Sequence, residues 1–337
     1  MQRSIPGKID VSIILPLLKR MAELVLLCLL VTLATFILSS WLPGDYFSSH
    51  FLDASVGHDT IAQLRRQYGL DQPVVLQYFH WLRNSFKLDM GYSLLYREPV
   101  FPVVLGSLAK TLWLGIPALI LGLGGGVMLG TLHGIHQNRP LGRSLGFLSG
   151  FMLSLPSLVL GIVALLLAAQ TRWFPLGGMS SNEIQHISHL SWLFDRLHHL
   201  ALPAACLMVP VLAATERIQF SAIRSSIESR HFRSAMARGL SRRKIIFRHL
   251  IRPSLNPVLS TSGPILGGVL SGSLVLEVLF AWPGLGRITY DALFNNDLYL
   301  LAGCVVACSF LLATGNLIAD VLVLLLDPRT REAGGKP

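Results

Sequence analysis

Long stretches without a charged side chain are the feature that most constrains what this chain can form. A helix needs about 20 mostly apolar residues to cross about 30 Å of hydrocarbon. Six charge-free stretches approach or exceed that length: 24–44, 111–138, 144–171, 197–215, 253–276 and 298–319. The stretch 197–215 is the shortest and has two histidines near its start. The sequence therefore predicts an all-α membrane protein with six transmembrane helices.

Charged residues are scarce, at 14% of the 337 residues, whereas 52% are hydrophobic. Soluble domains carry about 25% charged residues. The formal net charge of +10 suggests nucleic acid, but that function needs basic residues gathered on a soluble, folded surface. Here the basic residues lie between apolar stretches. We therefore expect membrane lipid around the chain and no nucleic-acid partner.

Lysine and arginine predict the orientation, because both are enriched in cytoplasmic segments. With the N-terminus inside, the inner segments hold 19 of the 28 Lys and Arg residues. We therefore expect both termini to be cytoplasmic. The expected parts are a cytoplasmic N-terminal segment (1–19), a first transmembrane helix (20–44), a large first outer loop (45–108), a five-helix core (109–326) that includes a cytoplasmic loop (216–256), and a cytoplasmic tail (327–337).

The outer loop contains a pattern typical of a short amphipathic helix. Val75, Phe79, Leu82 and Phe86 recur at helical spacing after the sequence Asp71-Gln72-Pro73. We expect this helix to lie at the outer interface of the membrane. Its role is either to cap the bundle or to contact an external partner.

Glycines recur every four residues in two of the predicted spans. They are Gly122, Gly126, Gly130 and Gly134 in the second span, and the pairs Gly263/Gly267 and Gly268/Gly272 in the fifth. This spacing lets helix backbones approach closely. Glycine is also simply common in membrane helices, so the pattern alone leaves both explanations open.

The most basic part of the chain is the cytoplasmic loop 216–256. Residues 232–238 lack Pro and Gly and predict a short helix, which Gly239 ends in a left-handed conformation. Ser241 is expected to cap a second helix through Ile251, with Pro253 ending it. Such a helix–Gly–helix unit could insert into a groove on another protein. It could equally anchor the chain on anionic lipid.

This loop resembles the signature loop of ABC importer permeases, in the dipeptide/oligopeptide/nickel branch. Arg233 departs from the glutamate at that position in the broad family, and Arg238 stands where lysine is common. The resemblance extends over about 17–331. The matching segments are 43–45, 68–73, 77–78, 81–82, 89–93, 110–112, 154–157, 276–287 followed by Asp297, 316–320 and 327–329.

The resemblance implies the type I importer permease fold in a bacterial inner membrane. It also implies three kinds of partner: a second similar permease, two cytoplasmic ATPase subunits that hold ATP and magnesium, and a periplasmic or lipid-anchored substrate-binding protein. This chain has no GxxxxGK[ST] phosphate loop. We therefore expect a non-catalytic subunit that binds no cofactor itself.

The loop that docks on the ATPase is implied by the same resemblance. Its residues are Arg233, Ser234, Ala235, Ala237, Arg238, Gly239, Leu240 and Ser241. The expected solute is a peptide or a related small molecule delivered from outside. The alternatives are a nickel or metal-chelate importer of the same branch, or a self-sufficient secondary transporter. The latter predicts internal repeats and midplane charges, which the sequence does not display.

Polar residues at the spans complete the candidate set. Glu277 ends the fifth span, and the turn after it carries Trp282, Pro283, Gly284 and Gly286. A charge inside the bilayer costs about 2.5–3.5 kcal/mol, so Glu277 must face a partner or water. We expect an outer-gate or structural role for it rather than contact with the solute.

Two further polar residues, Asn316 and Asp320, lie one turn apart in the sixth span. They are expected to hydrogen-bond to a neighbouring helix, with lining of the path as the alternative. The histidines 186, 189, 198 and 199 have no spacing typical of a metal site. We therefore predict no metal site.

Overall fold

The computed structural model of the chain describes residues 11–41, 71–181 and 189–326, and residues 63, 66 and 69. Several sequence-based predictions lie outside these residues. They are the tail 327–337, the motif segments 43–45 and 327–329, parts of the motif 68–73, and the position of His186.

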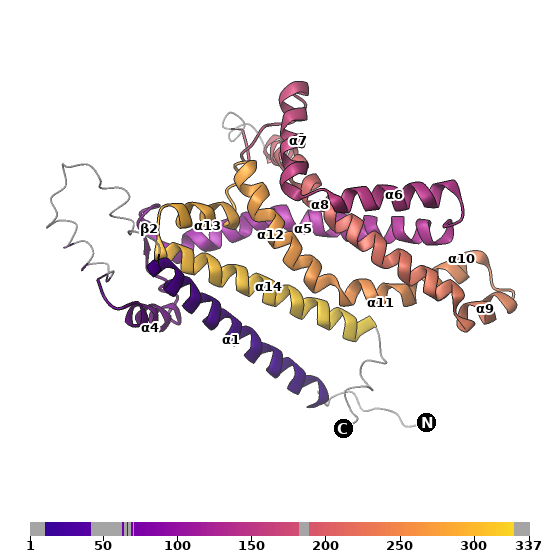
Figure 1. Cartoon of the computed structure of the whole chain (residues 1–337), viewed down its shortest axis with the longest axis horizontal. Helices are drawn as coiled ribbons and strands as arrows, with labels where there is room; N and C mark the ends of the chain where they lie inside the picture. The colour runs from indigo at the N-terminus through magenta and orange to yellow at the C-terminus, as the bar shows by residue number, and fades with distance from the viewer. Residues whose placement is uncertain are drawn as a thin grey trace. The chain divides into compact units, whose positions relative to one another are not determined.

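The described chain is almost entirely helical (Figure 1). The elements in order are α1 (Val11–Trp41), α4 (Val74–Ser85), β1 (Tyr92–Ser93), β2 (Glu98–Pro99), α5 (Val100–Ile135), α6 (Pro140–Ser154), α7 (Ser157–Thr171), α8 (His189–Glu228), α9 (Arg230–Ala237), α10 (Arg242–Lys244), the π-helix η1 (Ile245–Ile251), α11 (Arg252–Ser260), α12 (Ser262–Leu279), α13 (Leu285–Phe294) and α14 (Leu298–Leu326). The two strands form a small antiparallel hairpin in which Tyr92 pairs with Pro99.

Five helices are long and apolar enough to cross a membrane. They comprise Met21–Trp41, Val100–Ile135, His189–Glu228, Ser262–Leu279 and Leu298–Leu322. A sixth span exists if the bent pair α6 and α7 counts as one. The prediction of an all-α membrane protein is therefore confirmed at the level of five to six candidate spans.

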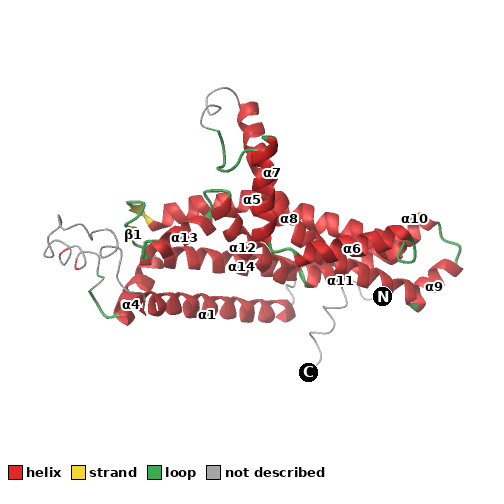
Figure 2. Cartoon of the chain, turned by 45° about the horizontal axis from the view of Figure 1, so that its top comes forward, coloured by secondary structure: helices red, strands yellow, loops and turns green. Residues whose placement is uncertain are grey.

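The prediction of one continuous third span over 144–171 is wrong. α6 and α7 meet at an angle of 98°, and Figure 2 shows α7 turned steeply away from α6. The break lies at Leu155, which is extended (φ −91°, ψ 116°), and Pro156, which caps α7. Proline disfavours the helical conformation of the residue before it, so the helix ends there.

Several helices extend beyond the apolar stretches that predicted them. α5 begins at Val100 rather than at 111, and α8 continues to Glu228 rather than ending at 215. α13 occupies part of a segment expected to be an outer loop. A helix does not have to end where the hydrocarbon ends, so charge-free length marks the membrane-embedded part and not the helix bounds.

The chain divides into two compact units. The first comprises Met1–Phe101, Ala292–Thr314 and Leu324–Pro337. Within it, α4 packs on α1 through a cluster of Phe36, Tyr78, Trp81 and Ala302. The amphipathic helix is thus confirmed near its predicted place, but it packs with a different face. Its buried residues are Gln77, Tyr78 and Trp81, whereas Val75, Phe79 and Phe86 are exposed.

The second unit comprises Pro102–Asp291 and Gly315–Val323. Its core gathers large apolar side chains from α5, α8, α12 and the turn after α12. They include Leu114, Leu207, Val269, Leu276, Phe280 and Trp282.

The glycine stripe of α5 lies directly against α8. A Cβ atom at Gly122 would meet Val211, one at Gly126 would meet Thr215, and one at Gly134 would meet Ile223. These glycines are therefore needed for close helix packing, as the first of the two explanations predicted. In the fifth span the result is mixed, because Gly263 faces Asn316 closely and Gly268 has open space around it.

Candidate coupling loop and outer turn

The loop predicted to be cytoplasmic begins with a capped helix, α9. Ser229 is its N-cap, with its hydroxyl accepting a hydrogen bond from the Phe232 amide at 3.2 Å and donating one to the Ser226 carbonyl at 2.7 Å. Ser229 thus separates α9 from the end of α8. Sequence reasoning missed this cap, although a serine three residues before Phe232 is a known signal for a helix start.

Gly239 ends the helical turn as predicted. Its φ angle is +67°, in the left-handed region that glycine adopts without strain, and its amide donates to the Met236 carbonyl at 3.1 Å. The space around it is open. The chain then turns back into α10, which begins directly after Ser241.

The helix after Gly239 differs from its prediction, because Pro253 does not end it. The chain passes from α10 through the π-helix η1 into α11, and Pro253 lies in the first turn of α11. Proline cannot donate to the carbonyl four residues back and its ring clashes with it. The wider π turn, in which the Arg252 amide bonds to the Phe247 carbonyl, ends just before that proline. π turns of this kind are common at functional sites.

The predicted loop residues differ in how they are presented. Arg233, Ser234, Ala237, Arg238, Gly239 and Ser241 are exposed, and Leu240 is half-buried. Ala235, by contrast, is only 4% exposed, and α9 packs against η1. The surface available to a partner therefore lies on the basic and small exposed side chains, while Ala235 belongs to the inner side of the loop.

A buried polar cluster joins α5, α8 and α11 at the base of the loop. The Glu216 carboxyl lies 2.6 Å from His133 Nδ1, and the His133 ring stacks on Phe220. The Gln219 amide donates to Thr131 at 3.1 Å and to Ser254 at 2.9 Å. Sequence analysis missed this cluster, since Glu216 lies just after a charge-free stretch and reads as the first residue of a loop.

A second buried polar cluster surrounds Glu277 at the end of α12. Its Oε1 accepts from the Thr111 hydroxyl at 2.8 Å, and its Oε2 accepts from the Gly286 amide at 2.7 Å and the Arg287 amide at 3.3 Å. The Thr111 oxygen also accepts from the Leu285 amide at 2.7 Å. Glu277 is 0% exposed, so its partners are the chain's own groups.

The other residues of the turn fit around this carboxyl group. The Trp282 indole donates to the Lys110 carbonyl at 3.0 Å, while Pro283 is half-buried beside it. A Cβ atom at Gly284 would collide with the Glu277 carboxyl, and one at Gly286 would reach it at 3.0 Å. These two glycines are therefore needed for the backbone to approach the carboxyl group. The structure brings together Glu277, Trp282, Pro283, Gly284 and Gly286, which the sequence groups in one motif.

The remaining predicted positions lie apart from the turn. Asn316 is half-buried against Gly263 of α12, and Asp320 is half-buried one turn further along α14. His198 Nε2 lies 2.7 Å from the Trp173 carbonyl, and His199 Nδ1 lies 2.9 Å from the Asp195 carbonyl. Within residues 11–41, 71–181 and 189–326, no group of three His, Cys, Asp or Glu side chains is arranged to hold a metal ion.

Each unit has a cavity of its own. In the second unit, a cavity of about 680 Å³ lies at the α6–α7 break, with Pro156, Ser157, Pro210, Ile265 and Gly272 among its lining residues. Its described lining residues are apolar or carry hydroxyl groups. A volume of this size lies in the range of small-molecule sites.

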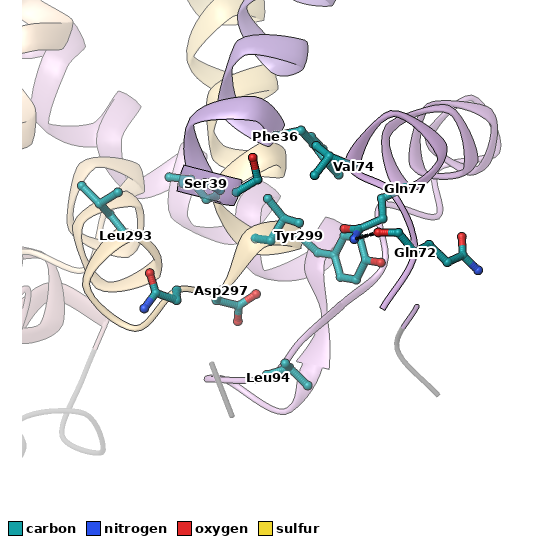
Figure 3. Close-up of a pocket in the computed structure, with 13 residues that line it drawn as sticks. Phe36, Ser39, Gln72, Val74, Gln77, Leu94, Leu293, Asp297 and Tyr299 are labelled. Atoms are coloured by element: carbon teal, nitrogen blue, oxygen red, sulfur yellow. Dashed lines mark hydrogen bonds between the residues drawn. The ribbon is translucent and has the colours of Figure 1, made fainter. Parts of the chain in front are cut away.

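A smaller cavity in the first unit, of about 260 Å³, lies where α1, α4 and the start of α14 meet (Figure 3). Asp297 is at its edge. This carboxyl group accepts from the Ser93 hydroxyl at 2.8 Å, the Leu95 amide at 3.1 Å and the Leu300 amide at 3.2 Å. Asp297 thus caps the start of α14 and links the β1–β2 hairpin to it. This gives a structural role to the aspartate that follows the motif 276–287.

Family comparisons place these features in a known class of membrane transport component. Residues 122–332 match the family described as "Binding-protein-dependent transport system inner membrane component", and residues 13–115 match the N-terminal part of such membrane components. The chain therefore belongs to the family of binding-protein-dependent transport system inner membrane components. It is a permease subunit of an importer, located in the inner membrane and crossing it several times.

Three relatives are similar over nearly their whole length. The oligopeptide transport system permease protein AppB of Bacillus subtilis is 30% identical over 89% of this chain and 93% of its own. The dipeptide transport system permease protein DppB of Lactococcus lactis subsp. cremoris is 30% identical, over 94% and 98% respectively. The oligopeptide transport system permease protein OppB of Haemophilus influenzae is 29% identical over 93% of this chain and 98% of its own.

Proposed function

We propose that this permease subunit carries peptides inward, powered by ATP hydrolysis on separate subunits. The proposed assembly contains a second similar permease, two cytoplasmic ATPase subunits with ATP and magnesium, and an external substrate-binding protein. The family description and the relatives named for peptide transport support this assignment. Both termini are proposed to be cytoplasmic, which agrees with the distribution of Lys and Arg.

The observation that carries the proposal is how α9 is attached to the bundle. α9 is exposed on its basic side and joined at one end to α8, a helix of 40 residues. At the usual rise, α8 is about 60 Å long. A displacement of α9 by a bound ATPase subunit would therefore be passed directly to a helix that lines the 680 Å³ cavity.

The cavity is the proposed part of the path that the solute contacts. Its apolar and hydroxyl lining suits a solute held by shape and by a few hydrogen bonds. The proposed role of Glu277 is structural: it fixes the turn between α12 and α13 as an outer gate. Its full set of hydrogen bonds within the chain supports this role over contact with the solute.

Substitution of Ala237 tests ATPase coupling. Ala237→Glu places an acid on the exposed side of α9 without disturbing a buried residue. We expect peptide uptake in proteoliposomes to fall to background, because a new carboxyl group at the contact opposes docking. Co-purification of the ATPase subunits should fall in parallel, while membrane insertion is unchanged.

Asn138→Glu is the matched control, since it adds the same acid at an exposed site in the short turn between α5 and α6, outside the candidate coupling loop. It should leave both uptake and co-purification at the wild-type level. Normal uptake by Ala237→Glu would refute the docking role of α9. If uptake is lost while the ATPase subunits still bind at the wild-type level, the substitution affects the solute path and not ATPase docking.

A further inference from the structure

Helix α4 has two distinct apolar faces, and within the described part of the chain only one of them packs against other helices. At about 100° per residue, Tyr78 and Trp81 lie on one side with Gln77, and they are 4%, 4% and 8% exposed respectively. Val75 and Phe79 lie on a second side and are 58% and 59% exposed. The first face is covered by α1, and the second is left open.

The open apolar face continues past the end of the helix and borders a polar one. Phe86, which follows Ser85, lies on the same side as Phe79 and is 82% exposed. His80, Arg83 and Asn84 form the third face of the helix and are also exposed. The helix therefore has a packing face, an apolar face and a mainly polar face that also carries Leu76, in turn around its axis.

The level at which α4 meets α1 is set by three contacts. The Phe36 ring lies 5.5 Å from the Tyr78 ring and 5.4 Å from the Trp81 ring, and the Tyr78 hydroxyl donates to the Leu29 carbonyl at 3.0 Å. Phe36 lies about 7.5 Å along the helix axis from Trp41, the last residue of α1, at about 1.5 Å per residue. α4 thus packs beside the apolar part of α1 and not beyond its end.

The surface of α1 on the sides turned away from this contact is apolar and exposed. Leu30 and Leu38 are 56% and 57% exposed, and Trp41 is 76% exposed. These residues belong to the candidate span Met21–Trp41, where lipid is the solvent. Helix α4 therefore packs on a helix whose remaining surface requires lipid.

We propose that the apolar face formed by Val75, Phe79 and Phe86 is a lipid-binding surface, which lies at the boundary between headgroups and acyl chains of the outer leaflet. Its ligand is the membrane phospholipid itself. Interfacial helices bury their apolar face about 5–10 Å into this boundary and keep their polar face in water, which matches the three faces of α4. A face reserved for a binding protein would be exposed to water whenever that protein is absent. The proposal rests on α1 crossing the membrane and is independent of which solute the permease carries.

Photocross-linking of the full chain tests this surface. Two variants carry a photoreactive side chain on the apolar face: Phe79→p-benzoylphenylalanine and Phe86→p-benzoylphenylalanine. Each substitution keeps an aromatic ring at its position. The chain is reconstituted in liposomes of phosphatidylethanolamine and phosphatidylglycerol that contain an alkyne-tagged phosphatidylethanolamine. We expect lipid labelling at both positions to be several-fold above that of Asn84→p-benzoylphenylalanine, which lies on the polar face.

A fourth variant, Leu30→p-benzoylphenylalanine, reports on α1. Strong lipid labelling at Leu30 with no excess at Phe79 and Phe86 over Asn84 would overturn this proposal alone. Absence of labelling at Leu30 would overturn the membrane span of α1 and this proposal with it. In cells that contain the whole transport system, cross-linking of Phe79 to the binding protein in place of lipid would also overturn it.

Discussion

Two buried glutamates in the same unit are supported in different ways. Both oxygens of Glu277 accept hydrogen bonds from the chain, from one hydroxyl and two backbone amides. Glu216 has one oxygen beside His133, and no described residue donates to its other oxygen or to the side-chain oxygen of Gln219. A fully satisfied polar cluster specifies one arrangement, whereas a partly satisfied one costs less to rearrange.

The two glutamates, with their different hydrogen-bond support, lie at different kinds of position in the unit. Glu277 holds a turn in which Ala281 has the unusual φ angle of +50° and two glycines approach the carboxyl group closely. Glu216 and Gln219 lie between α5, α8 and α11, and α8 and α11 are the helices that flank the coupling loop. We therefore expect the turn after α12 to be the more rigid of the two sites and the base of the loop to be the one that rearranges.

Removal of the Glu277 side chain should have the largest effect. Glu277→Ala leaves two buried amides and the Thr111 hydroxyl without their acceptor, and each buried group left unpaired costs about 1–3 kcal/mol. We expect a loss of at least about 3 kcal/mol in stability, seen as a large drop in the melting temperature of the purified protein. The equivalent change at the other cluster, Glu216→Ala, should cost clearly less. Equal losses at the two sites would contradict the comparison.

An added methyl group at Gly284 should have the next largest effect. Gly284→Ala forces a Cβ atom into the Glu277 carboxyl, and overpacking of this kind costs about 1–3 kcal/mol. Gly268→Ala is the matched control, because its Cβ atom would meet open space within α12. That control should be neutral or slightly stabilising, since alanine favours a helix by up to about 1 kcal/mol over glycine. Thermal unfolding of the two variants side by side distinguishes a crowded turn from a general intolerance of substitution.

Conversion of Glu216, at the base of the loop, to glutamine should have the smallest effect on stability. Glu216→Gln keeps the shape and retains an oxygen for His133, so we expect a change below about 1 kcal/mol. Glu277→Gln should lower the stability more. Both oxygens of Glu277 accept hydrogen bonds, so the NH₂ group of glutamine would face a hydrogen-bond donor at one of these positions. A larger loss of stability for Glu216→Gln than for Glu277→Gln, measured by unfolding in the same detergent, would reverse the assignment of the fixed and the movable cluster.

Much of the local structure of the candidate coupling loop was predictable, because its signals lie close together in the sequence. The helix over 232–238 and the left-handed Gly239 follow from residues within one or two turns of each other. The effect of Pro253 was predicted wrongly, since a π turn can accommodate a proline that an α-helix cannot. Ala235 was grouped with the docking residues that the resemblance implies, because no local signal says which side of α9 packs on η1.

The outer turn was predictable as a motif but not as a cluster. The sequence places Glu277, Trp282 and the glycines within ten residues. Thr111 and Lys110, which supply a hydrogen bond to Glu277 and an acceptor to Trp282, come from α5, more than 160 residues earlier. The inner cluster of His133, Glu216 and Gln219 is likewise formed from separate helices and has no sequence spacing of its own.

The sequence by itself determined that the chain is a helical membrane protein, because charge-free length and the distribution of basic residues depend only on the solvent around each segment. It also determined the short amphipathic helix in the outer loop. Only the tertiary structure decided where the third span breaks, which face of α4 packs on α1, and which polar groups share a buried site. Those outcomes depend on which surfaces other helices cover, and hydrophobic spacing along one helix does not contain that information.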